Sequence, residues 1–126
     1  MAVLALLTSC TNTDAPVNRE GHSGSSSAAV VAGVQEITID VDNSFRFTPS
    51  TITVHRGRVK VTLHHLGPGA PHNWQLTGIP GDYVATVWPG QTASVSFVAP
   101  APGSYEFVCT IHQRQGQTGT MVVLPN

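Results

Sequence analysis

Charged side chains, and lysine above all, are scarce in this chain of 126 residues. Asp, Glu, Lys and Arg together make up 10% of the residues, and Lys60 is the single lysine. The formal net charge is −1 with histidine neutral. Proteins that bind nucleic acid through its phosphates carry a basic patch or stripe, so from this charge balance we expect no nucleic acid partner. The length corresponds to one domain.

Cysteines and long apolar runs are also scarce. The two cysteines, Cys10 and Cys109, lie in different sequence surroundings, and we expect each to have its own role rather than to form a bridge. Without a disulfide framework, roughly ninety residues have to bury a hydrophobic core unaided, which is feasible at that size. No apolar run comes near the ~18 residues that a transmembrane helix needs.

The first 33 residues differ in composition from the rest. Residues 1–10, MAVLALLTSC, contain a short apolar run whose end resembles a bacterial lipobox. The resemblance implies a signal segment cleaved before Cys10, acylation of its thiol, and a lipid anchor on the outer face of a membrane at the cell envelope. No Lys or Arg precedes the run, so a start further upstream and a plain apolar N-terminus are the alternatives. Residues 11–33 are rich in small polar residues, and we expect them to form a disordered linker.

Residues 34–126 are predicted to form an all-β domain. Polar and apolar residues alternate through 36–41, with the period of a half-buried strand, and the alternation continues at Phe45 and Phe47. Residues 78–90 contain three turn-forming regions and are expected to be irregular. The pattern predicts about seven short strands and a Greek-key β-sandwich. The further strands are expected at 52–54, 59–63, 72–76, 94–97, 105–109 and 118–124.

A thiol and an imidazole occur together on a short loop between the last two predicted strands. His112 follows Cys109 by three residues, and Gln117 follows His112 by five. A thiolate and an imidazole so placed can hold a soft or borderline transition metal. The alternative is that Cys109, which faces the same side as the apolar residues of its strand, is an inert buried thiol. His72 in the segment APHNW is the candidate third ligand, and His₂Cys is the donor set of blue copper.

Residues 34–124 resemble the cupredoxins, the small blue copper proteins of the plastocyanin, amicyanin and auracyanin kind. The matching motifs are FRFTPS at 45–50, ITV at 52–54, Gly57, PHN at 71–73, PGSYEFVCTIH at 102–112, and the pairs GT and VV within 119–123. The resemblance implies one copper ion per chain, held by His72, Cys109 and His112. It also implies that Asn73 and Thr110 brace the cysteine loop and so fix the geometry of the ligands.

The axial ligand is where the chain departs from the usual family pattern. The family usually places Met a few residues after the second His, and here that position is Gln117. Gln in this place resembles the stellacyanin branch, although the disulfide normal to that branch has no counterpart here. Met121 is the alternative; it lies roughly 13 Å further along an extended strand, so the two residues cannot serve one site. A centre without an axial side chain is the third alternative.

Two adjacent histidines, His64 and His65, fall in a predicted strand and therefore face opposite sides of it. Only one of them can approach the metal site. We interpret both as structural or surface residues, with a second copper contact or a proton-linked role as the alternative.

The resemblance implies a type 1 copper protein that passes single electrons between redox partners at the cell envelope, is monomeric, and is not an enzyme. Partner proteins are expected to dock near His112, where Pro68, Ala70, Pro71 and Ile111 can supply a small apolar patch. The alternative is a copper-binding or delivery protein without redox turnover, although the chain lacks the Met-rich or His-rich tracts typical of such carriers. Zinc fits less well because Gln is a poor fourth zinc ligand.

Overall fold

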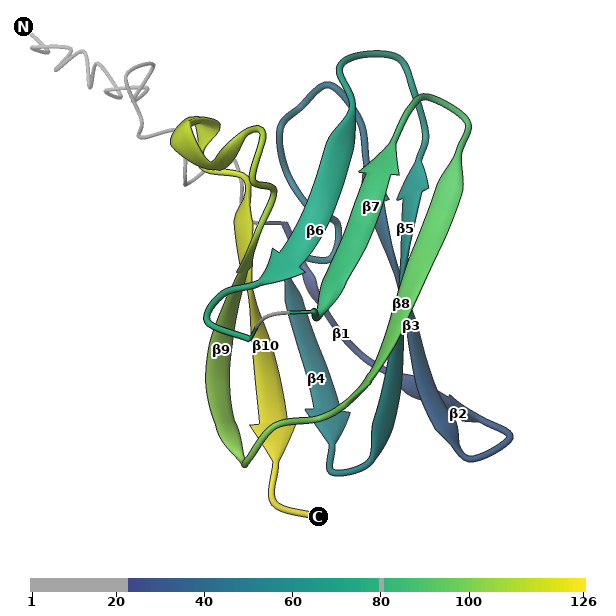
Figure 1. Ribbon diagram of the computed structural model, residues 1–126, viewed down its shortest axis with the longest axis vertical. Helices are drawn as coiled ribbons and strands as arrows, with labels where there is room; N and C mark the ends of the chain where they lie inside the picture. The colour runs from purple at the N-terminus through teal and green to yellow at the C-terminus, as the bar shows by residue number, and fades with distance from the viewer. Residues whose placement is uncertain (1–22, 80) are drawn as a thin grey trace, which may run out of the picture.

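Two β-sheets packed face to face make up the part of the chain that the computed structural model describes, residues 23–79 and 81–126 (Figure 1). The larger sheet has the strand order β1-β4-β10-β9-β6-β7, and the smaller has the order β2-β3-β5-β8. The strands of the larger sheet are β1 (Ser25–Ser27), β4 (Thr51–His55), β6 (His72–Leu76), β7 (Tyr83–Val87), β9 (Gly103–Val108) and β10 (Thr118–Leu124). Those of the smaller sheet are β2 (Ala29–Val31), β3 (Val34–Val41), β5 (Arg58–His65) and β8 (Thr92–Val98). The predicted all-β sandwich is confirmed.

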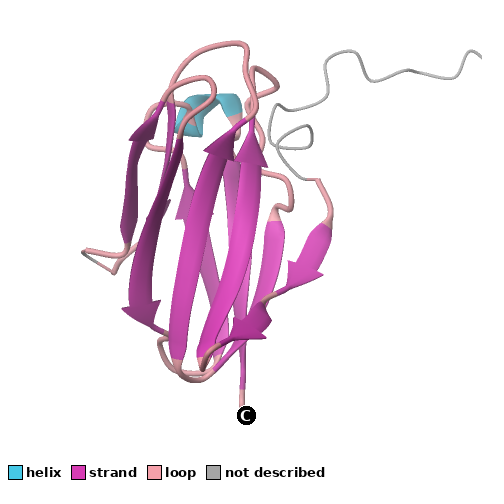
Figure 2. Ribbon diagram, turned by 90° about the vertical axis from the view of Figure 1, so that its right-hand side faces the viewer, coloured by secondary structure: helices cyan, strands magenta, loops and turns pink. Residues whose placement is uncertain are grey.

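The strands form because their apolar residues recur at every second position. In β5, Val59, Val61, Leu63 and His65 are buried, while the residues between them face outward. β-Branched residues fit such a pleated, half-buried surface well. A single turn of 3₁₀ helix, η1 (Gln113–Gln115), lies between β9 and β10, at the same end of the sandwich as the loops that follow β5 and β7 (Figure 2). None of the helical structure within the described residues is long and apolar enough to span a membrane.

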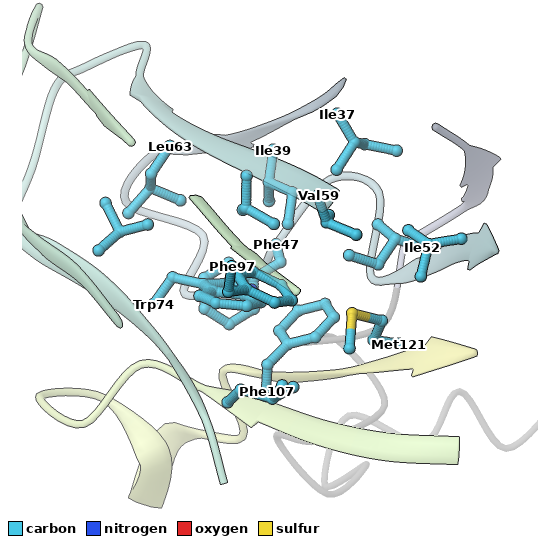
Figure 3. Close-up of a cluster of buried hydrophobic side chains, with 14 of the residues drawn as sticks. Ile37, Ile39, Phe47, Ile52, Val59, Leu63, Trp74, Phe97, Phe107 and Met121 are labelled. Carbon is cyan, nitrogen blue, oxygen red and sulfur yellow. The ribbon is translucent and has the colours of Figure 1, made fainter. Parts of the chain in front are cut away.

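Aromatic side chains fill the middle of the core (Figure 3). The ring of Phe107 lies 5.2 Å from that of Phe47 and 5.4 Å from that of Trp74, measured between centroids, and all three residues are fully buried. Burying one such ring stabilises a fold by about 1.5–3 kcal/mol, before any added aromatic contact. The core therefore gives the loops at the end of the sandwich a rigid base.

Strand β7 corrects the expectation that residues 78–90 are irregular. It pairs antiparallel with β6 at the edge of the larger sheet. The register shifts between His72 and Trp74, and both Val84 and Val87 are buried although they are three residues apart. An irregular spacing of this kind hides a strand from a search for strict alternation.

Strands β1 and β2 correct the expectation that the linker reaches residue 33. The ordered part of the chain begins no later than Ser23, whose backbone N–H donates to Ser50 Oγ at 2.6 Å. β1 pairs parallel with β4, and β2 pairs antiparallel with β3. All six residues of the two strands are exposed, so backbone hydrogen bonds rather than an apolar pattern hold them. The signal segment with Cys10 and the rest of the linker, residues 11–22, lie outside the described residues.

β3, the first strand that the sequence predicted, is shorter than the alternation of polar and apolar residues indicated. β3 ends at Val41, and residues 42–46 form a loop before the isolated bridge between Asp40 and Thr48. Phe47 is buried in the core, but Phe45 has a φ of +56°, a left-handed conformation that no strand residue adopts. The two phenylalanines therefore have different roles, although their spacing of two residues had predicted that both face the same side of one strand.

Candidate metal centre

Three adjacent strands of the larger sheet bring the predicted ligands together. β6, β9 and β10 are neighbours in the order β10-β9-β6, and β9 runs antiparallel to both of the others. The last two residues of β6 pair with the last two of β9, so the start of β6 lies beside the residues that directly follow β9. The start of β10 pairs with the end of β9. His72 begins β6, Cys109 directly follows β9, and Gln117 directly precedes β10.

The loop from Cys109 to Gln117 is closed by its own backbone hydrogen bonds. The N–H of Cys109 donates to the carbonyl of Gln117 at 2.9 Å, and the N–H of His112 donates to the carbonyl of Cys109 at 3.2 Å. Gly116 ends the 3₁₀ turn with a φ of +83°, a conformation that suits glycine. The loop is therefore a fixed frame for its side chains rather than a flexible connection.

The side chains of His72, Cys109 and His112 converge. One ligand atom from each residue, an imidazole nitrogen or the thiol sulfur, lies within 4.8 Å of the other two. Cys109 carries a free thiol whose sulfur is 3.6 Å from Nδ1 of His112. His72 and Cys109 are fully buried, and His112 is only 7% exposed. The expected trio is confirmed as a cluster able to hold a metal.

Asn73 ties the two halves of this cluster together. Its backbone N–H donates to the sulfur of Cys109 at 3.4 Å. Its side-chain amide donates to Thr110 Oγ1 at 2.7 Å and accepts from the Thr110 backbone N–H at 2.8 Å. Hydrogen bonds of this kind around a ligand set fix the orientation of the ligands and tune the metal. The pairing of Asn73 with Thr110 is the one that the family resemblance implied.

The two candidate axial residues lie in different surroundings. Gln117 is fully buried, and its Oε1 lies 2.8 Å from Nδ1 of His72. Met121 is also fully buried, but it belongs to the hydrophobic core, where it lies near Phe107 and Ile52 (Figure 3). Gln117 therefore contacts a residue of the cluster, whereas Met121 pairs with Ile52 of β4 and Tyr105 of β9. This arrangement favours Gln117 over Met121, and the axial assignment stays a prediction.

The two adjacent histidines face opposite sides, as predicted. His64 lies on the outer face of the smaller sheet, 3.4 Å from a carboxylate oxygen of Asp40. His65 is fully buried, with its ring centroid 5.1 Å from that of His72. The Gly67 N–H donates to its Nδ1 at 2.9 Å, and its Nε2 lies 2.8 Å from the carbonyl of Ala70. Both ring nitrogens therefore hold the loop before His72, so His65 is structural and not a metal ligand.

The chemistry of the cluster fits copper. A thiolate with two imidazoles is a soft and borderline donor set, which suits copper better than a hard cation. Burial lowers the pKa of His72, although the Gln117 oxygen opposes this in part, and burial likewise lowers the pKa of His112. Both imidazoles are therefore neutral at neutral pH, the form that binds a metal. Within the described part of the chain, the buried Nε2 atoms of Gln117 and His72 have no hydrogen-bond partner, so the hydrogen bonds around the cluster leave these two polar atoms unpaired.

Phe45 is a neighbour of the cluster that the sequence pattern did not reveal. Its ring centroid lies 4.7 Å from that of His112 and 6.3 Å from that of His72. The alternation of apolar residues had placed it in a strand, and its φ of +56° is what turns it toward the site instead.

Comparison with known proteins identifies the family. A family model for the cupredoxin-like domain matches residues 1–123, so the chain belongs to the cupredoxin-like domain family. His72, Cys109 and His112 are arranged as the copper site of that family. No curated protein sequence matches the chain significantly.

Several solved structures share the fold. The metal-binding domain of the Cu(I)-exporting P-type ATPase CopA of Streptococcus pneumoniae D39 superposes with a TM-score of 0.66 at 20% identity, over 82% of this chain and 99% of that one. Auracyanin of Roseiflexus castenholzii superposes with a TM-score of 0.60 at 23% identity, over 76% of this chain and 100% of that one. Auracyanin A of Chloroflexus aurantiacus, described as a "blue" copper protein, superposes with a TM-score of 0.64 at 23% identity, over 73% of this chain and 100% of that one. At these identities the likeness establishes the fold alone.

Proposed function

We propose that the protein is an electron carrier with one type 1 copper ion, in which His72, Cys109 and His112 are the strong ligands and Gln117 is the axial ligand. The observation that carries this proposal is the preassembled, buried set of one thiol and two imidazoles. When bound, copper supplies a one-electron couple between Cu(II) and Cu(I). The protein is a carrier and not an enzyme, because this single ligand set accounts for an electron transfer step without a substrate.

The residues around the site keep its geometry constant while the charge changes. The closed loop from Cys109 to Gln117 and the hydrogen bonds of Asn73 hold the thiol and the imidazole of His112 from both sides. Burial of His72 excludes water from that ligand. A site that does not rearrange between its two oxidation states exchanges electrons at low cost, because little structural work accompanies each transfer.

Replacing Gln117 with Met is expected to raise the reduction potential. The amide oxygen is a harder donor than a thioether sulfur, so Gln117 favours Cu(II), whereas a Met in its place would favour Cu(I). The two side chains have similar length, which leaves the loop undisturbed. A redox titration of the visible absorption of the copper-loaded variant, set against the wild type, measures the change.

Met121→Leu is the matched control for this substitution. It exchanges a buried thioether for a hydrocarbon of similar volume in the core, at an expected cost of less than about 1.5 kcal/mol, and it should leave the potential unchanged. A Gln117→Met variant whose potential is equal to or below that of the wild type would remove Gln117 from the axial position.

The docking surface for redox partners is proposed at the end of the sandwich that carries the site. Three large apolar side chains are exposed there: Ile111 at 45%, Leu66 at 55% and Trp88 at 56%. Hydrogen bonds of the His65 backbone to residues 90 and 91 hold the loop of Trp88 against that of Leu66. A small apolar surface suits weak, short-lived contacts, as electron exchange requires. Leu66 and Trp88 add to the prolines and Ile111 that the sequence suggested.

The cell envelope is the proposed location. It rests on the resemblance of residues 7–10 to a lipobox, which implies a lipid on Cys10; these residues lie outside the described part of the chain. A mass spectrum of the N-terminal peptide from the protein expressed in a bacterium tests the anchor, since an unmodified Cys10 would contradict it.

Copper delivery without redox turnover is the competing function, because the CopA metal-binding domain has a similar fold. The two are separated by cycling the copper-loaded protein with a soluble reductant and oxidant while a Cu(I) chelator is present. An electron carrier regains its full visible band in every cycle and yields no copper to the chelator. A delivery protein instead loses copper to the chelator from its reduced state.

A further inference from the structure

Phe45 combines two features that rarely occur together. It is a bulky residue with a φ of +56°, in the left-handed region that costs a non-glycine residue free energy. Its ring also packs against the imidazoles of two metal ligands. Backbone strain of this kind persists only where the surrounding structure enforces it, and it concentrates at functional sites.

The loop around Phe45 is fixed from several sides. Asp40 and Thr48 exchange two backbone hydrogen bonds of 2.8 and 3.0 Å at the base of the loop. Within it, the Ser44 backbone N–H donates to Asp42 Oδ1 at 2.8 Å. Across from it, Gly69 approaches so closely that a Cβ there would lie 2.5 Å from Cβ of Asn43. These contacts over-determine the loop and hold Phe45 in its strained conformation.

The position of the ring defines what it does. Its centroid lies 4.7 Å from that of His112 at an interplanar angle of 52°, and 6.3 Å from that of His72 at 65°, both within the range of aromatic contact. His112 is only 7% exposed. Phe45 is itself partly buried, so its ring contacts the two imidazoles and remains in part accessible to solvent.

We propose that Phe45 is a positioning residue of the copper centre, whose ring fixes the imidazole of His112 and keeps water and small anions from the metal. This inference rests on the proposed copper function and adds to it a residue that binds no metal. An apolar cover also disfavours the more highly charged oxidation state, because a low-dielectric surrounding stabilises net charge less than water does.

Three substitutions of Phe45 distinguish a role in positioning the His112 imidazole from a role in packing alone. Phe45→Ala removes the ring and keeps the strain, Phe45→Gly removes both, and Phe45→Leu keeps apolar bulk without an aromatic plane. Tyr83→Ala is the matched control, because it removes a partly exposed ring at the start of β7, while His72 pairs with the far end of that strand.

The readouts are taken on copper-loaded protein. In Phe45→Ala and Phe45→Gly we expect sodium azide to change the visible band, EDTA to compete as though copper affinity had fallen by about 10- to 100-fold, and the reduction potential to drop. Phe45→Leu should lie between these variants and the wild type, and Tyr83→Ala should match the wild type. Because glycine tolerates a positive φ, metal-free Phe45→Gly should unfold at a higher urea concentration than Phe45→Ala.

The outcomes also distinguish this inference from the proposed function. A wild type that shows the thiolate band, together with alanine and glycine variants that match it in azide response, EDTA competition and potential, overturns the role of Phe45 alone. A wild type that binds copper without a thiolate band overturns the proposed function instead. Variants that lose only stability assign Phe45 to packing and contradict the proposal.

Discussion

Replacing Cys109 with serine is expected to abolish the intense visible absorption of the copper-loaded protein. In a centre with a thiolate ligand, that band arises from charge transfer from sulfur to Cu(II), and a serine oxygen cannot supply it. Serine is close to cysteine in size, and the backbone bond from residue 109 to the Gln117 carbonyl does not involve the side chain. The fold should therefore survive while the chemistry is lost. The measurement is the visible spectrum after addition of one equivalent of Cu(II).

Copper affinity should fall along with the band. Substitutions of residues that merely orient a ligand already cost about 10- to 100-fold in affinity, so loss of the strongest ligand should cost at least as much. Met121→Leu serves again as the control, since it removes the chain's other described sulfur from the core and should leave the band intact. A Cys109→Ser variant that retains the band would show that the thiol is not a ligand.

Among the substitutions proposed here, replacing Gly119 with alanine is expected to cause the largest loss in the free energy of unfolding. Gly119 pairs with Phe107 across β9 and β10, and a Cβ built on it would clash with the ring of Phe107 and the carbonyl oxygen of Ser50. The ring cannot move aside easily, because Phe47 and Trp74 pack against it. The Ser50 carbonyl in turn accepts a hydrogen bond of 2.8 Å from the backbone N–H of Thr120. The substitution therefore overpacks the junction of three strands.

We expect the loss to be about 2–4 kcal/mol, from the middle of the usual range for overpacking to somewhat above it. For a domain of this size, that lowers the melting temperature by roughly 10–25 °C. Urea unfolding of the metal-free protein measures it. The outward-facing Thr120→Ala substitution in the same strand should cost about 1 kcal/mol or less. Equal stability of the Gly119→Ala variant and the wild type would contradict the packing described for this junction.

Most of the seven predicted strands could be recognised because polar and apolar residues alternate in them and one face is buried, as in β3 and β5. β6 does not alternate, since its first three residues are all buried, and it was marked instead by the turn-forming residues 67–71 before it. The other three strands, β1, β2 and β7, could not be predicted. β1 and β2 are exposed on both sides and are held by backbone pairing with β4 and β3. β7 buries two valines three residues apart, next to a register shift in β6. These three strands form through pairing with strands distant in the sequence, and the local alternation of polar and apolar residues does not indicate such pairing.

The metal cluster could be predicted because its residues are chemically distinctive and the sandwich topology allows β6 to lie beside β9. The pairing of Asn73 with Thr110 followed from the family resemblance. Phe45 could not be assigned, because its role depends on a left-handed backbone that the alternation of Phe45 and Phe47 conceals. Adjacent residues of a strand face opposite sides, so the sequence showed that only one of His64 and His65 faces inward. That the ring of His65 holds the loop before His72 became clear only from its hydrogen bonds.

We propose that one copper ion is bound through the sulfur of Cys109 and the imidazoles of His72 and His112. The most direct test is a titration of the metal-free protein with Cu(II), followed by visible absorption through reduction and reoxidation. We expect an intense band that rises linearly to one equivalent of copper, disappears on addition of one electron per copper, and returns in full on reoxidation. Copper binding without such a band, or a band that continues to grow well beyond one equivalent, would contradict it.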